Sequence, residues 1–473
     1  MQANSARRRL LYGTGAINYA LKDAAFGAFL LFYYKQVLGL SGTLTGVAIA
    51  ISIVWDAVSD PLVGAWSDRL RSRWGRRHPM MVASVLPLAL SFIAVFWPPA
   101  ILLDTQLPLF YWLLASVLLL RTALTFFMVP YLALGAEIST DYHERTLLAS
   151  ARTNLGWFVG VVVAASALAL IFTPQGGLDG RFVISHYQSY GILSAVGVII
   201  ASCICIGGTR AYIPTLPQSV HQPGSNLWRD IAGTLRNRNF RLIVMLETVL
   251  GGMSGIIATL LMVTYTYFWQ LDTAAISALF AAPPLLAVLL VTSSSRRLNL
   301  RFQKQQLLRV SCIFGALNLA WLTPLQLLGW LPDSSSGIVL GLLMVNYTLH
   351  TTFSIVRMVS IQAMLADVAD EHDLATGQRQ EGVLFAAAFF MAKFVSGFGF
   401  LVAGPFLDLI GLEAGMQPGE APRSVILGLG LIMGPGLAVL LAIPAWAAFK
   451  LDLNLETQLK TQQALKARDA PAG

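Results

Sequence analysis

The chain consists of long apolar stretches separated by short polar segments, and this pattern restricts its fold more than any other feature. A helix needs about 20 apolar residues to cross the hydrocarbon core of a bilayer. Because lipid offers no partners to open backbone groups, such stretches must form a bundle of helices. The predicted fold is an all-α membrane protein with twelve transmembrane helices, near residues 12–34, 44–66, 80–101, 108–134, 148–172, 190–208, 241–269, 273–291, 308–330, 337–365, 382–410 and 424–449.

The low charge content excludes an ordinary soluble protein. Charged residues make up 12% and hydrophobic residues 56% of the 473 residues, whereas soluble domains carry about 25% charged residues. The net charge of +8 does not indicate a nucleic-acid partner, because the basic residues lie in short loops between apolar stretches. Cys203, Cys205 and Cys312 lie within apolar stretches and are interpreted as small core residues.

The distribution of Lys and Arg predicts the orientation in the membrane. Basic residues gather in the N-terminus, in alternate loops and in the tail, whereas the loops on the other side contain only Lys35, Arg181 and Arg423. Cytoplasmic loops carry the excess of positive charge. We therefore expect both termini in the cytoplasm. The first apolar stretch contains Lys22 and Asp23 and is too long for a signal peptide, so it is interpreted as an uncleaved membrane helix.

The polar segment 209–240 divides the predicted helices into six and six. It contains three prolines, which is typical of a linker. The basic loops 67–79 and 292–307 occupy matching places on either side, which suggests a duplicated six-helix unit, as in transporters built from repeats. The predicted organisation is a bundle at 1–208, a cytoplasmic linker at 209–240, a second bundle at 241–449 and a cytoplasmic tail at 450–473.

Asp56 and Asp60 are one helical turn apart inside an apolar stretch, so their side chains share a helix face. A charge at the bilayer centre costs at least about 2.5–3.5 kcal/mol, and such residues usually mark a pathway. We predict that this pair, with the hydroxyl of Thr125, binds a coupling cation, either Na⁺ or H⁺. The alternative is that the charged groups form salt bridges that only fix helix packing.

Other charged groups in the apolar stretches suggest a binding site for a solute. Asp23 can accept hydrogen bonds from sugar hydroxyls, and the guanidinium of Arg152 can bind anionic or hydroxyl-rich groups. Trp157, just beyond Arg152, can stack on an apolar sugar face, although a Trp in a membrane helix more often serves packing. We assign a charge-balancing role to three further residues, Lys22, Arg121 and Arg357.

No motif supports an enzyme. The six His do not cluster, and the chain has no zinc-protease, nucleophile-elbow or Walker sequence. We therefore expect no catalytic residue, no cofactor and no metal other than a coupling Na⁺. A membrane-embedded sensor or scaffold that transports nothing is an alternative function, but such a protein would normally carry a soluble domain.

Four motifs together resemble the glycoside–pentoside–hexuronide cation symporters, a family of the major facilitator superfamily that includes melibiose permease. They are W-D-A-V-S-D-P-L-V-G at residues 55–64, D-R-L-R-S-R-W-G-R-R-H-P at 68–79, Y-G-x-G at 12–15 followed by Lys22 and Asp23, and A-D-V-A-D at 366–370 followed by T-G-Q-R-Q-E-G at 376–382 and by Lys393. The resemblance covers both halves and implies the major facilitator fold.

The resemblance also implies roles for single positions. Asp56, Asp60 and Thr125 match the cation site, Asp23 and Arg152 match sugar-binding residues, and Lys393 matches a lysine near both sites. Five residues are expected to help open and close the cytoplasmic side, namely Asp68, Arg69, Arg145, Asp367 and Asp370. The basic residues among them also serve to keep their loops inside.

Two positions depart from the family pattern. Met128 replaces a third aspartate of the cation site, and Leu132 replaces a tryptophan of the sugar site. Arg121 lies seven residues before Met128, on the same helix face. We hypothesise that Arg121 neutralises Asp56 or Asp60, so that Na⁺ coupling is weakened or replaced by H⁺ coupling. The lost tryptophan disfavours a galactoside substrate.

These observations predict a monomeric secondary transporter of a bacterial inner membrane. The expected function is cation-coupled symport of a sugar or glycoside-like solute by alternating access. The alternative within transport is a lysophospholipid or similar amphiphile, because residues 137–146 fit the vertebrate lysophospholipid importers of the same superfamily about as well.

Overall fold

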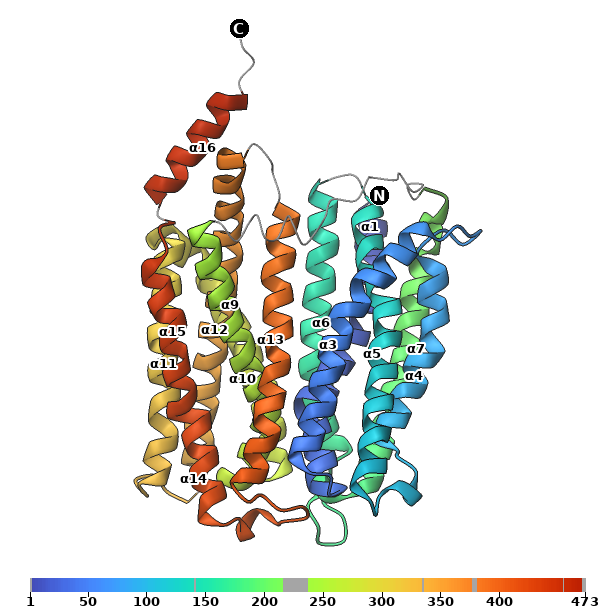
Figure 1. The fold of residues 1–473 in the computed structure, drawn as a ribbon, viewed down its shortest axis with the longest axis vertical. Coiled ribbons are helices and arrows are strands. Elements are labelled where there is room, and N and C mark those ends of the chain that lie inside the picture. Colours follow the sequence, from blue (N-terminus) through green and yellow to red (C-terminus); the bar gives the residue numbers. More distant parts are fainter. Residues whose placement is uncertain are drawn as a thin grey trace.

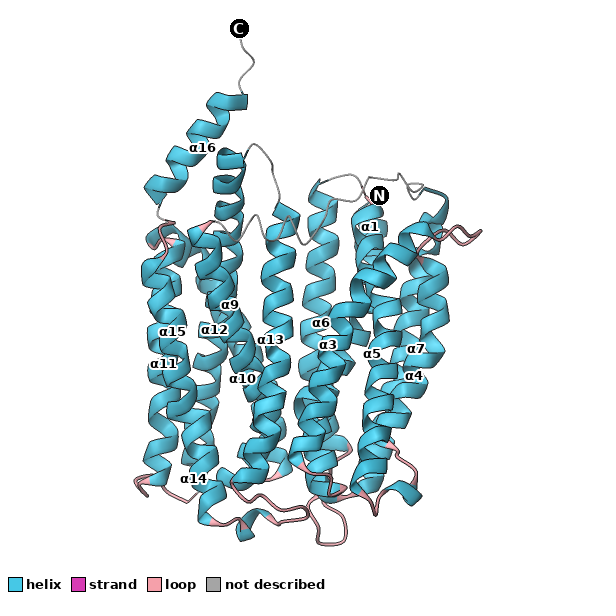
Figure 2. Ribbon diagram, in the orientation of Figure 1, coloured by secondary structure: helices cyan, strands magenta, loops and turns pink. Residues whose placement is uncertain are grey.

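The computed structural model describes residues 2–139, 142–215, 237–333, 336–376, 381–453 and 455–469. Within these ranges the regular elements are helices (Figure 2), apart from one isolated bridge between Gln175 and Leu178. Among the described residues, eleven helices are long and apolar enough to cross a membrane. The all-α membrane fold predicted from the apolar stretches is therefore confirmed, while the number twelve is not.

The membrane helices form two groups that follow the order of the chain (Figure 1). The first group contains α3 (Gly42–Arg69), α4 (His78–Phe96), α5 (Gln106–Glu137), α6 (Tyr142–Leu170) and α7 (Ile184–Thr209). The second group contains α9 (Arg238–Val263), α10 (Thr273–Arg301), α11 (Lys304–Leu327), α12 (Gly337–Thr376), α13 (Glu381–Leu409), α14 (Arg423–Leu431) and α15 (Leu437–Lys450). We call them the N-terminal and C-terminal halves.

The first predicted span is helical but changes helix type along its length. It begins with α1 (Gln2–Gly13), passes through a 3₁₀ turn (Thr14–Ala16) into α2 (Ile17–Ala24), and continues through π-helical segments at Ala25–Leu30 and Tyr33–Val37. This segment is not among the eleven helices that meet the criteria of length and apolar composition, and its sequence is interrupted by the charged residues Lys22 and Asp23. Wide π-turns often occur at functional sites, and these follow directly after Lys22 and Asp23.

Two predicted segments are described only in part. Of the linker expected at 209–240, residues 216–236 lie outside the described residues, and Arg210–Thr215 form a 3₁₀ segment. In the tail, Leu455–Asp469 form α16. This helix contacts α12, where Gln458 donates a hydrogen bond to Asp367 over 2.6 Å. Both ends of the chain lie at the same end of the molecule (Figure 1).

The two halves meet closely where α3 packs against α13. Gly42 and Gly46 of α3 face Gly404 and Phe400 of α13, and a Cβ atom at Gly42 would lie only 2.5 Å from the backbone oxygen of Gly404. A Cβ at Gly46 would lie 2.6 Å from the backbone oxygen of Phe400. Small residues four apart let membrane helices approach through their backbones. The G-x-x-x-G spacing of α3 therefore fixes this contact between the halves.

Charged pairs join the halves on the face opposite the termini. Lys35 Nζ lies 2.6 Å from Asp408 Oδ1, and Asp408 also accepts hydrogen bonds from the backbone N–H groups of Gly42 and Thr43 at the start of α3. A carboxylate at a helix N-terminus satisfies open donors and the helix dipole together. Asp408 thus ties α13 to both Lys35 and α3.

Arg181 forms a second connection on that face. Its side chain is only 2% exposed, and it donates to Thr266 Oγ1 over 2.6 Å and to the backbone oxygen of Leu271 over 2.9 Å. It also pairs with Asp179 of its own loop over 2.5 Å. Burial acts to raise the pKa of Asp179, but the hydrogen bonds and charge of Arg181 outweigh it, so the pKa lies below its ordinary value.

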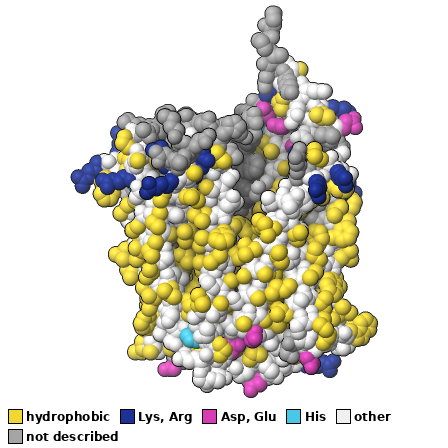
Figure 3. All heavy atoms as spheres, turned by 180° about the vertical axis from the view of Figure 1, so that it is seen from behind, with side chains coloured by type: hydrophobic (Ala, Val, Ile, Leu, Met, Phe, Trp, Pro, Cys, Tyr) yellow, Lys and Arg dark blue, Asp and Glu magenta, His cyan; other side chains and the backbone are white. Residues whose placement is uncertain are grey.

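On the face that carries the termini, the ion pairs among the described residues stay within one half. Arg77 pairs with Asp68 and Glu137, each over 2.6 Å, in the N-terminal half. Lys304 pairs with Asp367 over 2.8 Å in the C-terminal half. Lys and Arg gather at this end, above a belt of hydrophobic side chains, and the surface is hollowed between the halves there (Figure 3).

Candidate functional site

Charged residues from three helices meet where the two halves face each other. Asp56 and Asp60 lie one turn apart on α3, Arg121 and Thr125 one turn apart on α5, and Lys393 on α13. Arg121 Nη1 lies 2.9 Å from Asp56 Oδ2, and Lys393 Nζ lies 2.8 Å from the same oxygen and 2.9 Å from Asp60 Oδ2. We call these five residues the charge cluster.

Thr125 completes the charge cluster. Its hydroxyl lies 3.1 Å from Asp56 Oδ1 and 3.0 Å from Asp60 Oδ1, so its single hydrogen can be donated to either carboxylate. Each carboxylate oxygen of the pair therefore has a neighbour within hydrogen-bond distance. Two negative and two positive side chains also leave the cluster with no net charge.

The guanidinium of Arg121 is firmly held. The residue is 5% exposed, its Nε donates to Ser52 Oγ over 3.0 Å, and its Cζ lies 5.0 Å from the ring centre of Phe26. At an effective dielectric constant of 20, opposite charges 4 Å apart attract by about 4 kcal/mol. Arg121 thus occupies the side of Asp56 where a bound cation would otherwise find a free carboxylate.

A cavity of about 580 Å³ adjoins the charge cluster. Asp23, Arg152 and Trp157 line it from the N-terminal half, and Lys393 lines it from the C-terminal half. Met128 and Leu132 also lie in its wall, so the two departures from the family pattern are located at the cavity itself. The combination of a carboxylate, a guanidinium and an exposed aromatic face suits a hydroxyl-rich solute.

Lys22 and Asp23 form an ion pair between neighbours in the sequence. Lys22 is buried, with its Nζ 4.0 Å from the ring centre of Tyr19, whereas the side chain of Asp23 is half exposed to the cavity. Lys22 therefore balances the charge of Asp23 from behind and leaves its outer face available to a ligand.

The remaining predicted residues lie elsewhere. Arg357 is buried inside the C-terminal half and donates to the backbone oxygen of Ser311 and to Ser354 Oγ, both over 2.9 Å, away from the charge cluster. Arg145 donates to the backbone oxygen of Ser139 over 2.6 Å. Among the described residues, Arg69 and Asp370 have no ion pair. Residues 377–380, part of one predicted motif, lie outside the described residues.

Three charged residues with a notable place in the structure were not assigned a role from the sequence. Lys35 and Asp408 join the halves, although Asp408 falls at the end of a predicted span. Glu247 lies in the middle of the span Arg238–Phe268, and no ion pair holds it among the described residues. A lone acid within an apolar stretch was the available signal for both Glu247 and Asp408.

Comparison with known proteins gives a consistent result. The model of the family described as MFS/sugar transport protein matches residues 11–454. The chain is 23% identical to the inner membrane symporter YicJ of Escherichia coli K12, over 96% of this chain and 94% of that one. It is 22% identical to the isoprimeverose transporter of Lactiplantibacillus pentosus, over 84% and 80%.

Two further matches bear on the fold and on the alternative substrate. The nucleoside transporter NupG superposes with a TM-score of 0.60 at 13% identity, over 94% of this chain and 99% of that one, which supports the fold alone. A sodium-dependent lysophosphatidylcholine symporter of Danio rerio is 29% identical, but over only 35% of this chain and 31% of its own length.

Proposed function

The chain belongs to the MFS/sugar transport protein family, and from this premise we propose that it couples the uptake of a sugar or glycoside-like solute to the entry of protons. It is a secondary transporter embedded in a membrane, and not an enzyme. The proposed location is a bacterial inner membrane with both termini in the cytoplasm, and the proposed functional unit is a monomer.

One observation carries the proposed coupling: Lys393 belongs to both the charge cluster and the cavity. Its ammonium group lies within 2.9 Å of Asp56 and Asp60, and its side chain lines the space beside Asp23 and Arg152. Any change in the charge of either carboxylate therefore changes how strongly Lys393 is held away from a solute in the cavity. Such linkage is reciprocal, because the solute must then affect cation binding equally.

The occupants of the charge cluster favour H⁺ over Na⁺. Na⁺ binds through several oxygen ligands, but Arg121 already pairs with Asp56 Oδ2, and Lys393 already pairs with Oδ2 of both Asp56 and Asp60. Met128, which replaces a third aspartate, contributes no carboxylate. A proton needs only one oxygen. The side chain of Asp60 is 37% exposed and has a single positive partner, Lys393, so we propose Asp60 as the group that takes up the proton.

The same geometry supports alternating access. Lys35, Asp408 and Arg181 hold the halves together on the face opposite the termini, while on the other face the ion pairs between described residues stay within each half. We propose that this conformation exposes the cavity to the cytoplasm, and that Asp68, Arg69, Arg145, Asp367 and Asp370 rearrange when the halves rock to the opposite state.

The test is transport into membrane vesicles with imposed gradients. A thermal-shift screen against sugars, glycosides, uronates and lysolipids first selects a labelled substrate. We expect a pH gradient to drive its accumulation and a Na⁺ gradient at constant pH to have no effect. Strong stimulation by Na⁺ without any response to pH would overturn the proposed coupling.

A lysophospholipid is the second candidate substrate, supported by the partial match to the Danio rerio symporter. A headgroup phosphate would pair with Arg152 and Lys393, which both line the cavity. Competition distinguishes the two candidates: displacement of a fluorescent lysolipid by sugars at millimolar concentration favours the sugar site, whereas displacement only by other lysolipids favours the amphiphile.

A further inference from the structure

Arginines of the basic loop 67–79 point in two directions. Arg76 and Arg77 turn inward, and their side chains lie 2.8 and 2.6 Å from Glu137 Oε1. Arg71 and Arg73 are exposed, and among the described residues no carboxylate pairs with either of them. The inward pair stabilises the N-terminal half, so only the outward pair is available to a partner outside the chain.

A tight turn presents Arg73 together with an aromatic side chain. The hydroxyl of Ser72 accepts a hydrogen bond from the backbone N–H of Trp74 over 3.0 Å, and the backbone oxygen of Ser72 accepts one from Gly75 over 3.0 Å. Gly75 has a φ of 74°, which a residue with a side chain rarely adopts. The turn leaves Trp74 45% exposed. We call Arg71, Arg73 and Trp74 the loop surface.

The loop surface lies where the apolar belt of the molecule ends. In Figure 1 this loop extends sideways from the ends of α3 and α4, rather than onward along the helix axes. The next turns of α4 expose three apolar side chains four residues apart, Val82, Leu86 and Leu90. Exposed Trp side chains at the end of such a belt are typical of the boundary between hydrocarbon and headgroups.

The matching loop of the C-terminal half repeats this arrangement. Arg297 and Arg301, at the end of α10, are exposed and have no ion pair with another described residue. Phe302 follows directly and is 47% exposed. Lys and Arg lie at the outer edges of both halves at this end (Figure 3). Since both halves combine outward arginines with an exposed ring, the pattern reflects surroundings that the two loops share.

We propose that the loop surface binds the headgroup of an anionic phospholipid in the leaflet on the side of the termini. A guanidinium pairs with a phosphate through two parallel hydrogen bonds, and basic clusters beside a membrane helix attract anionic lipids. The backbones of Arg71 and Arg73 are about 7 Å apart at most, so both side chains can reach one phosphate. Positive charge alone would orient the loop, but orientation needs neither the turn nor the exposed ring of Trp74.

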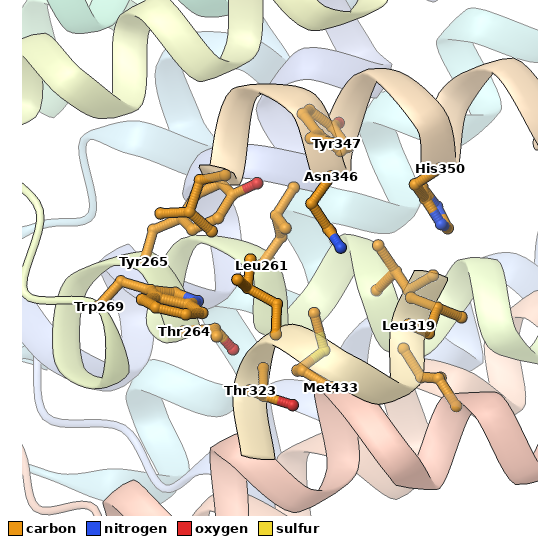
Figure 4. Close-up of a pocket in the computed structure, with 14 residues that line it drawn as sticks. Leu261, Thr264, Tyr265, Trp269, Leu319, Thr323, Asn346, Tyr347, His350 and Met433 are labelled. Atoms are coloured by element: carbon orange, nitrogen blue, oxygen red, sulfur yellow. The ribbon is translucent and has the colours of Figure 1, made fainter. Parts of the chain in front are cut away.

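Two cavities in the described part of the chain are the alternative places for an anionic headgroup. The cavity of about 70 Å³ inside the C-terminal half has no Lys or Arg in its lining (Figure 4), so it does not attract a phosphate. The cavity of about 580 Å³ has Arg152 and Lys393 in its wall. A binding experiment therefore has to separate this larger cavity from the loop surface.

The test is native mass spectrometry of the purified full-length protein, titrated with phosphatidylglycerol and with phosphatidylcholine. The double variant Arg71→Gln, Arg73→Gln removes both guanidinium groups of the loop surface. The matched control is Arg210→Gln, Lys460→Gln, which removes two exposed positive charges elsewhere at the same end. Arg152→Gln removes the guanidinium of the larger cavity. Transport is not the readout, so the result does not depend on the proposed function.

We expect the wild type, the control and Arg152→Gln to prefer phosphatidylglycerol by at least about tenfold, since each arginine near an anionic headgroup contributes roughly fivefold. The loop variant alone should lose this preference. A preference lost in Arg152→Gln but kept in the loop variant would place the lipid in the cavity, and equal losses in the loop variant and the control would reduce the effect to net charge. Either result would overturn the proposal, as would competition by inorganic phosphate as strong as that by the lipid. If the double variant does not fold, Arg73→Gln alone should lower the preference several-fold, and an unchanged preference would contradict the proposal.

Discussion

At the scale of single residues, the proposed coupling rests on the charge cluster. Asp56 is buried and has two positive partners, Arg121 and Lys393, whereas Asp60 is partly exposed and has one. A buried carboxylate is tolerated in a membrane only when it is paired or protonated. Asp56 is therefore the more firmly paired of the two carboxylates, and Asp60 is the one to which we assign the coupling role.

Asp60→Asn is expected to abolish accumulation of substrate against a gradient and to preserve exchange of substrate across the membrane. The amide can still accept from Thr125, but it can neither bind a proton nor attract Lys393 as an ion. Vesicle uptake and counterflow measure the two activities separately. Asp104→Asn, in an exposed turn, is the control. Normal concentrative uptake by Asp60→Asn would contradict the coupling role.

Arg121→Gln is expected to lower the stability and to make it depend on Na⁺. Removing one partner of a buried ion pair typically costs about 3–5 kcal/mol, and the loss here should lie near the lower end of that range because Lys393 still pairs with Asp56 over 2.8 Å. A cation that enters the vacated space beside Asp56 recovers part of this loss. Thermal unfolding in NaCl and in choline chloride measures the difference.

Wild-type protein and Arg301→Gln, at the exposed end of α10, serve as controls and should unfold at the same temperature in both salts. If Na⁺ stabilises the wild type as strongly as Arg121→Gln, then Arg121 does not occupy the cation position.

At the scale of the helices, the contact between α3 and α13 is built from glycines. Gly46→Ala is expected to destabilise the protein by about 1–3 kcal/mol, because the new methyl would lie 2.6 Å from the backbone oxygen of Phe400. Gly341→Ala on α12 is the matched control, since a Cβ there meets nothing within 4 Å, and alanine in a helix is favoured by up to about 1 kcal/mol. Thermal unfolding of both variants tests this, and equal shifts would contradict the close contact.

Comparison of the predicted spans with the observed helices shows how far the sequence predicted the structure. The span predicted at 44–66 is α3 (Gly42–Arg69), and the short break between the spans predicted at 241–269 and 273–291 is present, because apolar length and turn residues are local signals. The change of helix type in the first span was not predicted, since nothing in its hydropathy marks a π-turn. The pair Lys35–Asp408 was not predicted either, because it depends on how the halves dock across 373 positions.

At the scale of the molecule, ion pairs among the described residues join the halves at the charge cluster and on the face opposite the termini. The position of the cavity relative to that face can be measured. In a protein with Cys203, Cys205 and Cys312 replaced, Thr153→Cys places a thiol in the wall of the 580 Å³ cavity. A membrane-impermeant maleimide is expected to label it rapidly in inside-out vesicles and slowly in right-side-out vesicles. Leu178→Cys, exposed on the opposite face, should show the reverse preference.

Asp408→Asn is then expected to raise labelling of Thr153→Cys in right-side-out vesicles several-fold. The substitution removes the partner of Lys35 and a charged acceptor at the start of α3, so the contact between the halves opens more often.

Mild acid should not open this contact. Arg181 lowers the pKa of Asp179, so Asp179 keeps its negative charge until the pH falls below the ordinary pKa of an aspartate, about 3.9. Labelling of the parent thiol should therefore be equal at about pH 7 and about pH 5, and a marked rise at the lower pH would show that another acid controls the closed face.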